Sequence, residues 1–188
     1  MEIRCERVLL RPWRRGDEAA LVRYANNRSV WRNLRDRFPH PYTAADADAW
    51  IRHVEETGEP STCFAIVFGA EPVGAVGLER RADVSRQSLK LGYWLGEPFW
   101  GRGLATEAAR AISRYAFDAF EAARLEASVF EWNPASGRVL LKSGFHLEAR
   151  LEKSVFKDGQ LIDRLIYARF RTGDLPEAAR EERRDVVR

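Results

Sequence analysis

The sequence predicts a single α+β domain, in which helices cover both faces of a mixed sheet. First, its 188 residues fit one domain and would crowd two. Second, 45% of the residues are hydrophobic and 31% are charged, a balance typical of a globular chain that builds its own core. Third, the local patterns follow the order strand, two or three helices, three strands, helix, strand, helix and hairpin, which is typical of a mixed sheet.

The first half of the chain is expected to be one strand followed by helices. Residues 6–12 alternate between apolar and polar side chains and end in a turn, as a strand does. Asp17 is a good N-cap for the helix that follows, and a second short helix is expected after Ser29. Residues 35–42 contain two prolines and should form an irregular loop, because proline disfavours the helical conformation in the residue before it. Thr43, with an acidic residue three positions later, predicts a capping box and a third helix.

The second half is expected to supply most of the sheet. The predicted strands are 63–68, 73–78, 85–95, 125–130, 145–156 and 161–170, and the predicted helices are 105–120 and 133–144. An Asp-Gly pair between the last two strands signals a hairpin turn. We therefore assign residues 1–170 to the domain. Residues 171–188 carry many charges and almost no large apolar side chains, which predicts a helical or disordered tail.

Composition excludes several classes of function. The formal net charge is only +3, and no basic run with interleaved aromatic residues is present, so no nucleic-acid partner is expected. Cys5 and Cys63 cannot form a disulfide framework, and three scattered histidines predict no metal site. The chain shows no leader-like start and no apolar run long enough to span a bilayer. We therefore expect a cytoplasmic protein without a membrane partner.

The stretch from Trp94 to Glu107, WLGEPFWGRGLATE, carries the clearest chemistry. A strand runs into a glycine-rich turn that opens a helix. Gly101 and Gly103 let the backbone curl and let a ligand approach closely. The unpaired N–H groups of the helix start then converge, with the positive end of the helix dipole behind them, and Arg102 adds a charge suited to phosphate oxygens. The turn therefore predicts a phosphate or pyrophosphate site, although structural turns also contain glycine.

Two motifs resemble those of one family. The turn from Trp100 to Ala105, WGRGLA, resembles the acetyl-CoA signature Q/R-x-x-G-x-G/A of the GNAT N-acetyltransferase superfamily, with Trp100 in place of the leading Gln or Arg. The stretch from Asn133 to Phe145, NPASGRVLLKSGF, resembles the N-x-x-S…G-F helix of the branch that includes ribosomal-protein N-terminal acetyltransferases. The resemblance covers roughly residues 8–170, and the order of the two motifs makes it specific.

The resemblance implies a fold, a ligand and its position. The fold is a single GNAT-type domain with a mostly antiparallel sheet, in which the strand that ends at Leu95 diverges from its parallel neighbour at 125–129. The pantetheine arm of acetyl-CoA would lie in this gap, where diverging strands leave backbone groups unpaired. No metal is implied. The implied cofactor-binding residues are Tyr93, Trp94, Leu95, Gly101, Arg102, Gly103, Leu104, Ala105, Thr106, Asn133 and Ser136.

The implied reaction is direct attack of a primary amine on the thioester of acetyl-CoA. A backbone N–H near Leu95 is expected to stabilise the oxyanion. Many relatives carry a Tyr acid on the second motif's helix, at the position that is Leu140 here. Ser136 lies four residues earlier on the same helical face, so it is the candidate to bond the thiol sulfur and relay its proton. Asn133 would either bond the cofactor arm or only cap the helix.

The general base and the acceptor are less specified. Glu79, at the end of a strand, and Glu131, just before Asn133, are candidate bases, and each also fits an ordinary surface carboxylate. The acceptor is a protein N-terminus or a small-molecule amine. Its site is expected among the early helices and their proline-rich loop, which could act as a lid, with the candidate lining residues Trp31, Phe38, His40 and Tyr42. These aromatic residues also fit plain packing against the sheet.

Two further points stay open in the sequence. The absence of the usual Tyr at Leu140 and of an unambiguous base leaves a second hypothesis, a catalytically weak acetyl-CoA sensor or scaffold protein. An exposed strand edge or a helix pair would support a homodimer.

Overall fold

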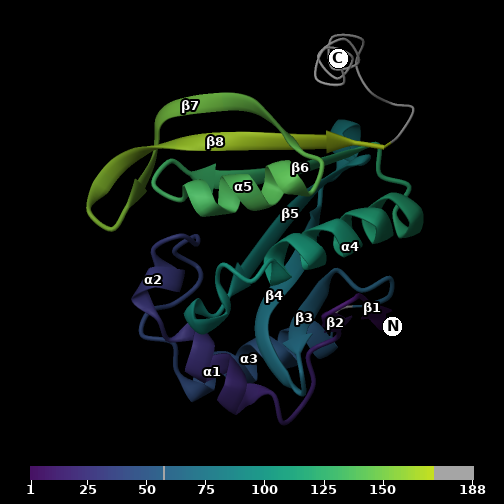
Figure 1. The fold of residues 1–188 in the computed structure, drawn as a ribbon, viewed down its shortest axis with the longest axis vertical. Helices are drawn as coiled ribbons and strands as arrows, with labels where there is room; N and C mark the ends of the chain where they lie inside the picture. Colours follow the sequence, from purple (N-terminus) through teal and green to yellow (C-terminus); the bar gives the residue numbers. More distant parts are fainter. Residues whose placement is uncertain (57, 172–188) are drawn as a thin grey trace.

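One sheet of eight strands runs through the protein (Figure 1). The computed structural model describes residues 1–56 and 58–171. In spatial order the strands are β1 (Ile3–Arg4), β2 (Val8–Arg11), β3 (Cys63–Phe68), β4 (Glu71–Arg80), β5 (Ser88–Leu95), β6 (Arg124–Phe130), β8 (Gln160–Phe170) and β7 (His146–Lys157). The helices are α1 (Glu18–Ala25), α2 (Arg28–Trp31), α3 (Ala44–Glu55), α4 (Leu104–Ala119) and α5 (Pro134–Lys142), with 3₁₀ turns at Asp83–Ser85 and Glu97–Phe99. Of these neighbours only β5 and β6 are parallel, so the expected α+β fold with one parallel pair is confirmed.

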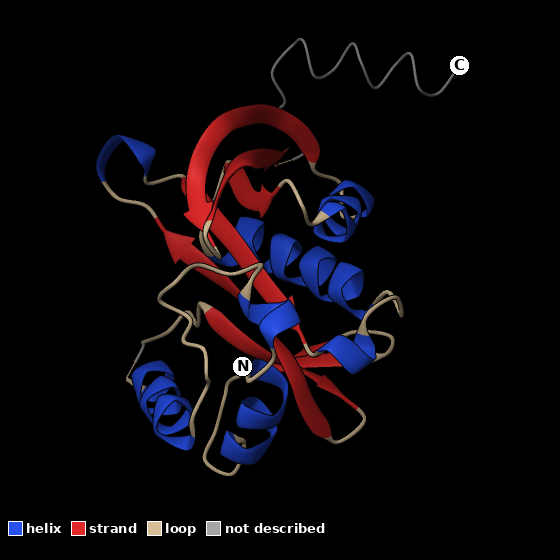
Figure 2. Ribbon diagram, turned by 90° about the vertical axis from the view of Figure 1, so that its left-hand side faces the viewer, coloured by secondary structure: helices blue, strands red, loops and turns tan. Residues whose placement is uncertain are grey.

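Strand β3 shows why its sequence is an unbroken apolar run. Phe64 and Ile66 belong to a core cluster that also contains residues of α4 and α5, whereas Ala65 and Val67 belong to a second cluster with residues of α1 and α3. Successive strand residues point to opposite faces, so both faces are buried here. The helices lie on both sides of the sheet in Figure 2. We call the two sides the α4/α5 face and the α1/α3 face.

Several predicted boundaries shift in the structure. Strand β5 begins at Ser88, and not at residue 85, because Asp83–Ser85 form a 3₁₀ turn. Strand β1 was not predicted, since two residues are too few to show an alternating pattern. The capping box at Thr43 is confirmed: its hydroxyl accepts the Asp46 N–H, and the Asp46 carboxylate accepts the Thr43 N–H. None of the described helices is both long and apolar enough to cross a membrane. The predicted tail lies outside the described residues, apart from Arg171.

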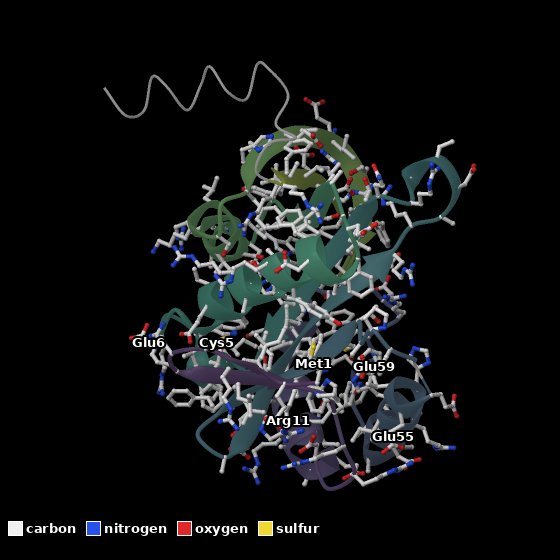
Figure 3. The ribbon with its side chains drawn as sticks, turned by 90° about the vertical axis from the view of Figure 1, so that its right-hand side faces the viewer. Met1, Cys5, Glu6, Arg11, Glu55 and Glu59 are labelled. Carbon is white, nitrogen blue, oxygen red and sulfur yellow. The ribbon has the colours of Figure 1, made fainter. Side chains whose placement is uncertain are left out.

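Asp17 corrects the prediction for the first helix. It occupies the N-cap position of α1, but its side chain makes no capping hydrogen bond to the helix. Instead its two carboxylate oxygens accept from the two terminal nitrogens of Arg11, at 2.7 and 2.8 Å, and one also accepts the Arg14 N–H. Arg11, labelled in Figure 3, and Asp17 are both buried. A buried arginine in β2 competes more strongly for this carboxylate than the helix amides do.

Replacing Asp17 with alanine is expected to lower the free energy of unfolding by about 3 kcal/mol, because it leaves the Arg11 charge buried without a counter-charge. The matched control is Asp48→Ala. Asp48 pairs with Arg15 and Arg52, but its side chain is 42% exposed, so its loss should cost about 1 kcal/mol or less. Urea unfolding of both variants measures the two values. Equal losses would show that burial does not strengthen the dependence of Arg11 on its partner.

Candidate functional site

The two parallel strands separate and open a cleft. Strands β5 and β6 pair only from Ser88 opposite Arg124 to Lys90 opposite Glu126, after which they diverge (Figure 1). A cleft of about 1140 Å³ is lined by the diverging ends of both strands, by the starts of α4 and α5, and by the loop between α2 and α3. The divergence predicted for the strand that ends at Leu95 is therefore present, and the cleft reaches both faces of the sheet.

The backbone of β5 turns unpaired groups toward this gap. The Gly96 N–H donates to the Val73 carbonyl at 2.8 Å. Hydrogen-bonded pairs alternate along an antiparallel ladder, so the register places the N–H and C=O groups of Tyr93 and Leu95 on the side away from β4. The Trp100 indole N–H donates a hydrogen bond to the Leu95 carbonyl at 2.6 Å, so this carbonyl is no longer unpaired. The Tyr93 groups and the Leu95 N–H then face the gap, where the pantetheine arm is expected. Trp94 alternates with them, and its backbone faces β4.

The glycine turn leaves the start of α4 open. Gly101 and Gly103 have φ values of +74° and +79°, a region that favours glycine, and both line the cleft. The first hydrogen bond of helix α4 is made by the Glu107 N–H, which donates to the carbonyl of the N-cap residue Gly103 at 3.1 Å. Gly103 is the N-cap and has no side chain to offer, so the preceding amides, those of Leu104, Ala105 and Thr106, have no helical acceptor. These three residues also line the cleft.

Arg102 points elsewhere. Its guanidinium carbon lies 5.7 Å from the centre of the Phe99 ring, its residue is exposed, and it is not among the residues that line the cleft. The cradle is therefore made of backbone amides, without the guanidinium that the sequence suggested.

A pair that sequence reasoning missed holds the turn in place. The Glu107 carboxylate accepts the Arg7 N–H at 2.7 Å and the Arg7 Nε at 3.0 Å, and Arg7 Nη1 donates to the Arg102 carbonyl at 2.7 Å. Burial acts to raise the pKa of Glu107, but the hydrogen bonds from Arg7 and Val8 outweigh it and hold that pKa below its usual value. The carboxylate is thus tied to β2, away from the open amides. The residues lie 100 positions apart, and no local pattern signals such a contact.

Ser136 meets a second hydroxyl. Its Oγ lies 2.7 Å from Tyr93 Oη, and the Tyr93 hydroxyl donates to the Ser136 carbonyl at 3.1 Å. Burial raises the pKa of Tyr93, so this phenol stays protonated at neutral pH. Asn133 caps α5, with its side-chain oxygen accepting the Ser136 N–H at 3.2 Å. Leu140 is fully buried in the core, and Ser136, Asn133 and Tyr93 all line the cleft.

The two candidate bases are placed differently. Glu79 lines the cleft, where Arg35 donates to its carboxylate at 2.7 Å and holds the pKa of Glu79 below its usual value. Glu131 does not line the cleft. Its carboxylate accepts the Asp163 N–H and an Arg150 N–H, both at 2.9 Å, and so belongs to the β7–β8 hairpin.

The predicted acceptor residues also divide into two pairs. Phe38 and Tyr42 line the cleft, and their ring centres lie 5.0 Å apart, with Phe38 also 5.7 Å from the Trp94 ring. Trp31 and His40 do not line it. They stack on each other at 5.5 Å, and the Lys157 ammonium lies 3.7 Å from the centre of the Trp31 ring. Of the four aromatic candidates, only Phe38 and Tyr42 of the proline-rich loop therefore line the cleft.

Comparisons with known proteins agree with this geometry. The sequence profile of a family described as "Acetyltransferase (GNAT) domain" matches residues 7–146. The chain is 29% identical over 106 residues to the ribosomal-protein-serine acetyltransferase of Escherichia coli, covering 56% of this chain and 59% of that protein. It is 29% identical over 155 residues to the spermidine N(1)-acetyltransferase of the same organism, covering 81% of this chain and 80% of that protein.

The fold has close structural counterparts. The structure of RimJ from Mycobacterium smegmatis, solved with a coenzyme A disulfide, superposes with a TM-score of 0.78 at 25% identity, covering 92% of this chain and 86% of that one. The chain spans about half the length of several curated relatives that it matches.

Proposed function

Because the chain belongs to the acetyltransferase (GNAT) domain family, we propose that it transfers an acetyl group from acetyl-CoA to a primary amine. The observation that carries this proposal is the cleft where β5 leaves β6, with unpaired backbone groups of β5 on one side and the open amides of α4 at its end. Both ends of the cleft are needed: the amides suit a pyrophosphate, and the gap between strands suits an extended arm.

The residues present fit acetyl-CoA. The Tyr93 and Leu95 backbone would bond the arm, and the amides from Leu104 to Thr106 would bind the pyrophosphate. Arg138 and Lys142 of α5 line the same cleft and add positive charge. When bound, acetyl-CoA supplies a thioester whose carbonyl carbon is open to attack by an amine.

The cleft residues then divide the work. The Leu95 N–H faces the gap and would stabilise the oxyanion, and the Ser136 hydroxyl would bond the departing sulfur and relay a proton to it. Cys63 also lines the cleft, but burial raises its pKa to about 12, so it stays a thiol and is no nucleophile at neutral pH. We therefore propose direct attack of the acceptor amine on the thioester, without an acyl-enzyme at Cys63.

The need for a base depends on the acceptor. An α-amine has a pKa near 8, so about a tenth of it is neutral at pH 7, whereas only a few in ten thousand of lysine side chains are. Glu79, with its pKa held low by Arg35, is a weak base and suits the α-amine better. Relatives are described as acting on a ribosomal protein and on spermidine, and both a protein N-terminus and a small amine remain within this proposal.

Two coarser features complete the proposal. Cys5 and Cys63 are both free, which suits the reducing cytoplasm. Strand β7 is at the edge of the sheet, and the hairpin tip exposes Phe156 and Leu161, so a homodimer would use this edge.

Acetyl-CoA-dependent release of free thiol, measured against N-terminal peptides, aminoglycosides, polyamines and free amino acids, tests the proposal. Release with one acceptor class is the expected result. Thermal unfolding with and without acetyl-CoA is measured in parallel. A raised melting temperature without release would favour the sensor or scaffold, which the buried Leu140 and the paired Glu79 would then explain. No shift in melting temperature would overturn the cofactor site itself.

A further inference from the structure

The cleft carries more positive than negative charge. Six arginine or lysine residues line it, against two carboxylates. The basic residues are Arg35, Arg37, Lys90, Arg138, Lys142 and Arg164, and the acidic ones are Asp46 and Glu79. Both carboxylates are already engaged, Asp46 in its capping box and Glu79 with Arg35. The positive charge is therefore only partly compensated by the protein.

Strand register places part of this charge on the side away from α4 and α5. Lys90 pairs with Glu126, and Ser128 and Phe130 follow at two-residue steps on β6, so their side chains share one face. Phe130 pairs with Arg164 of β8, which puts Arg164 on this face as well. Trp94, four residues after Lys90, shares it and contacts Phe38. This is the α1/α3 face, whereas Ser136 and Tyr93 meet on the α4/α5 face.

Two polar side-chain atoms that line the cleft on the α1/α3 face are buried without partners. Arg164 Nε and Ser128 Oγ have no hydrogen-bond partner among the described residues, and both side chains line the cleft. Two other basic side chains that line the cleft, Arg35 and Arg37, flank Glu79, at 2.7 and 3.7 Å. Glu126 on the same face is held by Arg81 and Arg124. Arg164 therefore has no carboxylate left to pair with in this part of the chain.

A partly buried guanidinium and a buried hydroxyl without partners cost free energy that a ligand can recover. We propose that Arg164 and Ser128 bind an anionic group, a carboxylate or phosphate, that the acceptor carries close to its amine. The planar guanidinium offers paired N–H groups to two oxygens of such a group, and the serine hydroxyl adds a third donor. This inference rests on the proposed acetyl transfer for the identity of the acceptor. The anion site would distinguish between the two acceptor classes. Polyamines carry only positive charge, so Arg164, Arg37 and Lys90 would repel them.

Matched tripeptides test the charge preference directly. Each has a free α-amine and an amidated C-terminus, and they differ only at the second position, which is Asp, phosphoserine, Asn or Lys. We expect kcat/KM to be at least about tenfold higher for the Asp peptide than for the Asn peptide, since a hydrogen bond to a charged group is being added. The Lys peptide and spermidine should be poorer still. Comparison of the Asp and phosphoserine peptides distinguishes carboxylate from phosphate recognition.

Variants assign the preference to the two residues. Arg164→Gln is expected to raise KM for the Asp peptide about tenfold or more and to bring it close to the Asn peptide, with Kd for acetyl-CoA unchanged. Arg164→Lys should keep part of the preference, and Ser128→Ala should weaken it. The control is Arg114→Gln, since Arg114 is exposed on α4 and does not line the cleft. Loss of activity toward all peptides alike in Arg164→Gln would make Arg164 structural and overturn the inference.

A binding measurement separates this inference from the proposed function. The tripeptides with Asp or Asn at the second position are prepared with an acetylated N-terminus, so that they resemble the product. They are then titrated calorimetrically into the CoA-saturated protein. Tighter binding of the Asp peptide that is lost in Arg164→Gln supports the anion site even where no peptide is turned over. Equal binding of the two peptides refutes it, whatever the transferase assay shows.

Discussion

Glutamate in place of Gly103 is expected to weaken acetyl-CoA binding about 100-fold or more. The backbone there has a φ of +79°, which a side chain adopts only at a cost of about 1–2 kcal/mol, and a Cβ would approach Arg7 Nη2 to 3.1 Å. The larger effect is electrostatic. A carboxylate at the N-cap would occupy the amides of α4 and repel the pyrophosphate, and each charge-assisted hydrogen bond lost is worth about 1.5–3 kcal/mol. Calorimetric titration with acetyl-CoA measures the change.

The matched control for this change is Gly69→Glu. Gly69 also has a positive φ, +64°, in the turn between β3 and β4, and a Cβ there meets nothing within 4 Å. It should share the backbone cost and lower the melting temperature slightly, but leave the Kd for acetyl-CoA as it is. Unchanged binding in Gly103→Glu would show that the cofactor does not use this turn.

Alanine in place of Ser136 is expected to lower kcat about 100-fold while the Kd for acetyl-CoA changes less than threefold. Proton transfer by a positioned side chain contributes about 10²–10⁴ in rate, and the hydroxyl is the group assigned to the departing sulfur. The variant should fold, because Tyr93 still donates to the Ser136 backbone carbonyl and Asn133 still caps the helix. Steady-state kinetics with a saturating acceptor give kcat.

Tyr93→Phe separates the two hydroxyls. It removes the partner that lies 2.7 Å from Ser136 Oγ but leaves Ser136 itself. We expect a smaller loss of kcat, since Tyr93 positions the serine and, with its pKa raised by burial, does not give up its proton at neutral pH. A Ser136→Ala variant with unchanged kcat would reduce Ser136 to an ordinary residue of the first helical turn. A larger loss in Tyr93→Phe than in Ser136→Ala would move the proton donor to the phenol.

The fold was predictable because its signals are local. The unbroken apolar run from Cys63 to Phe68, the capping box at Thr43 and the glycine turn before Leu104 each fix an element within a few residues. Asp17 shows the limit of such signals. The sequence correctly indicates an N-cap position, but the partner of the side chain is decided by a strand that approaches it in the folded chain.

The candidate site was predictable only where it is built from neighbours in sequence. The two glycines and the Asn133–Ser136 turn come from motifs, and they line the cleft as expected. The Arg7–Glu107 ion pair is set by the packing of α4 against the start of β2, and strand register brings Arg164 and Ser128 to one face. No single stretch of sequence reveals either arrangement. For the same reason Glu131 was a reasonable candidate base from its place beside Asn133, although its carboxylate is bound to the hairpin.

The cleft passes through the sheet, with Ser136 and Tyr93 on one face and Arg164 and Ser128 on the other. In the proposed reaction acetyl-CoA would therefore enter from the α4/α5 face and the acceptor from the α1/α3 face. The two would meet only in the gap between β5 and β6. Such an arrangement requires a ternary complex, and it lets each product leave without displacing the other. A bisubstrate inhibitor for this protein would have to extend through the gap between β5 and β6. It would carry CoA at one end and an acidic amide at the other, joined by a linker narrow enough to fit between the two strands.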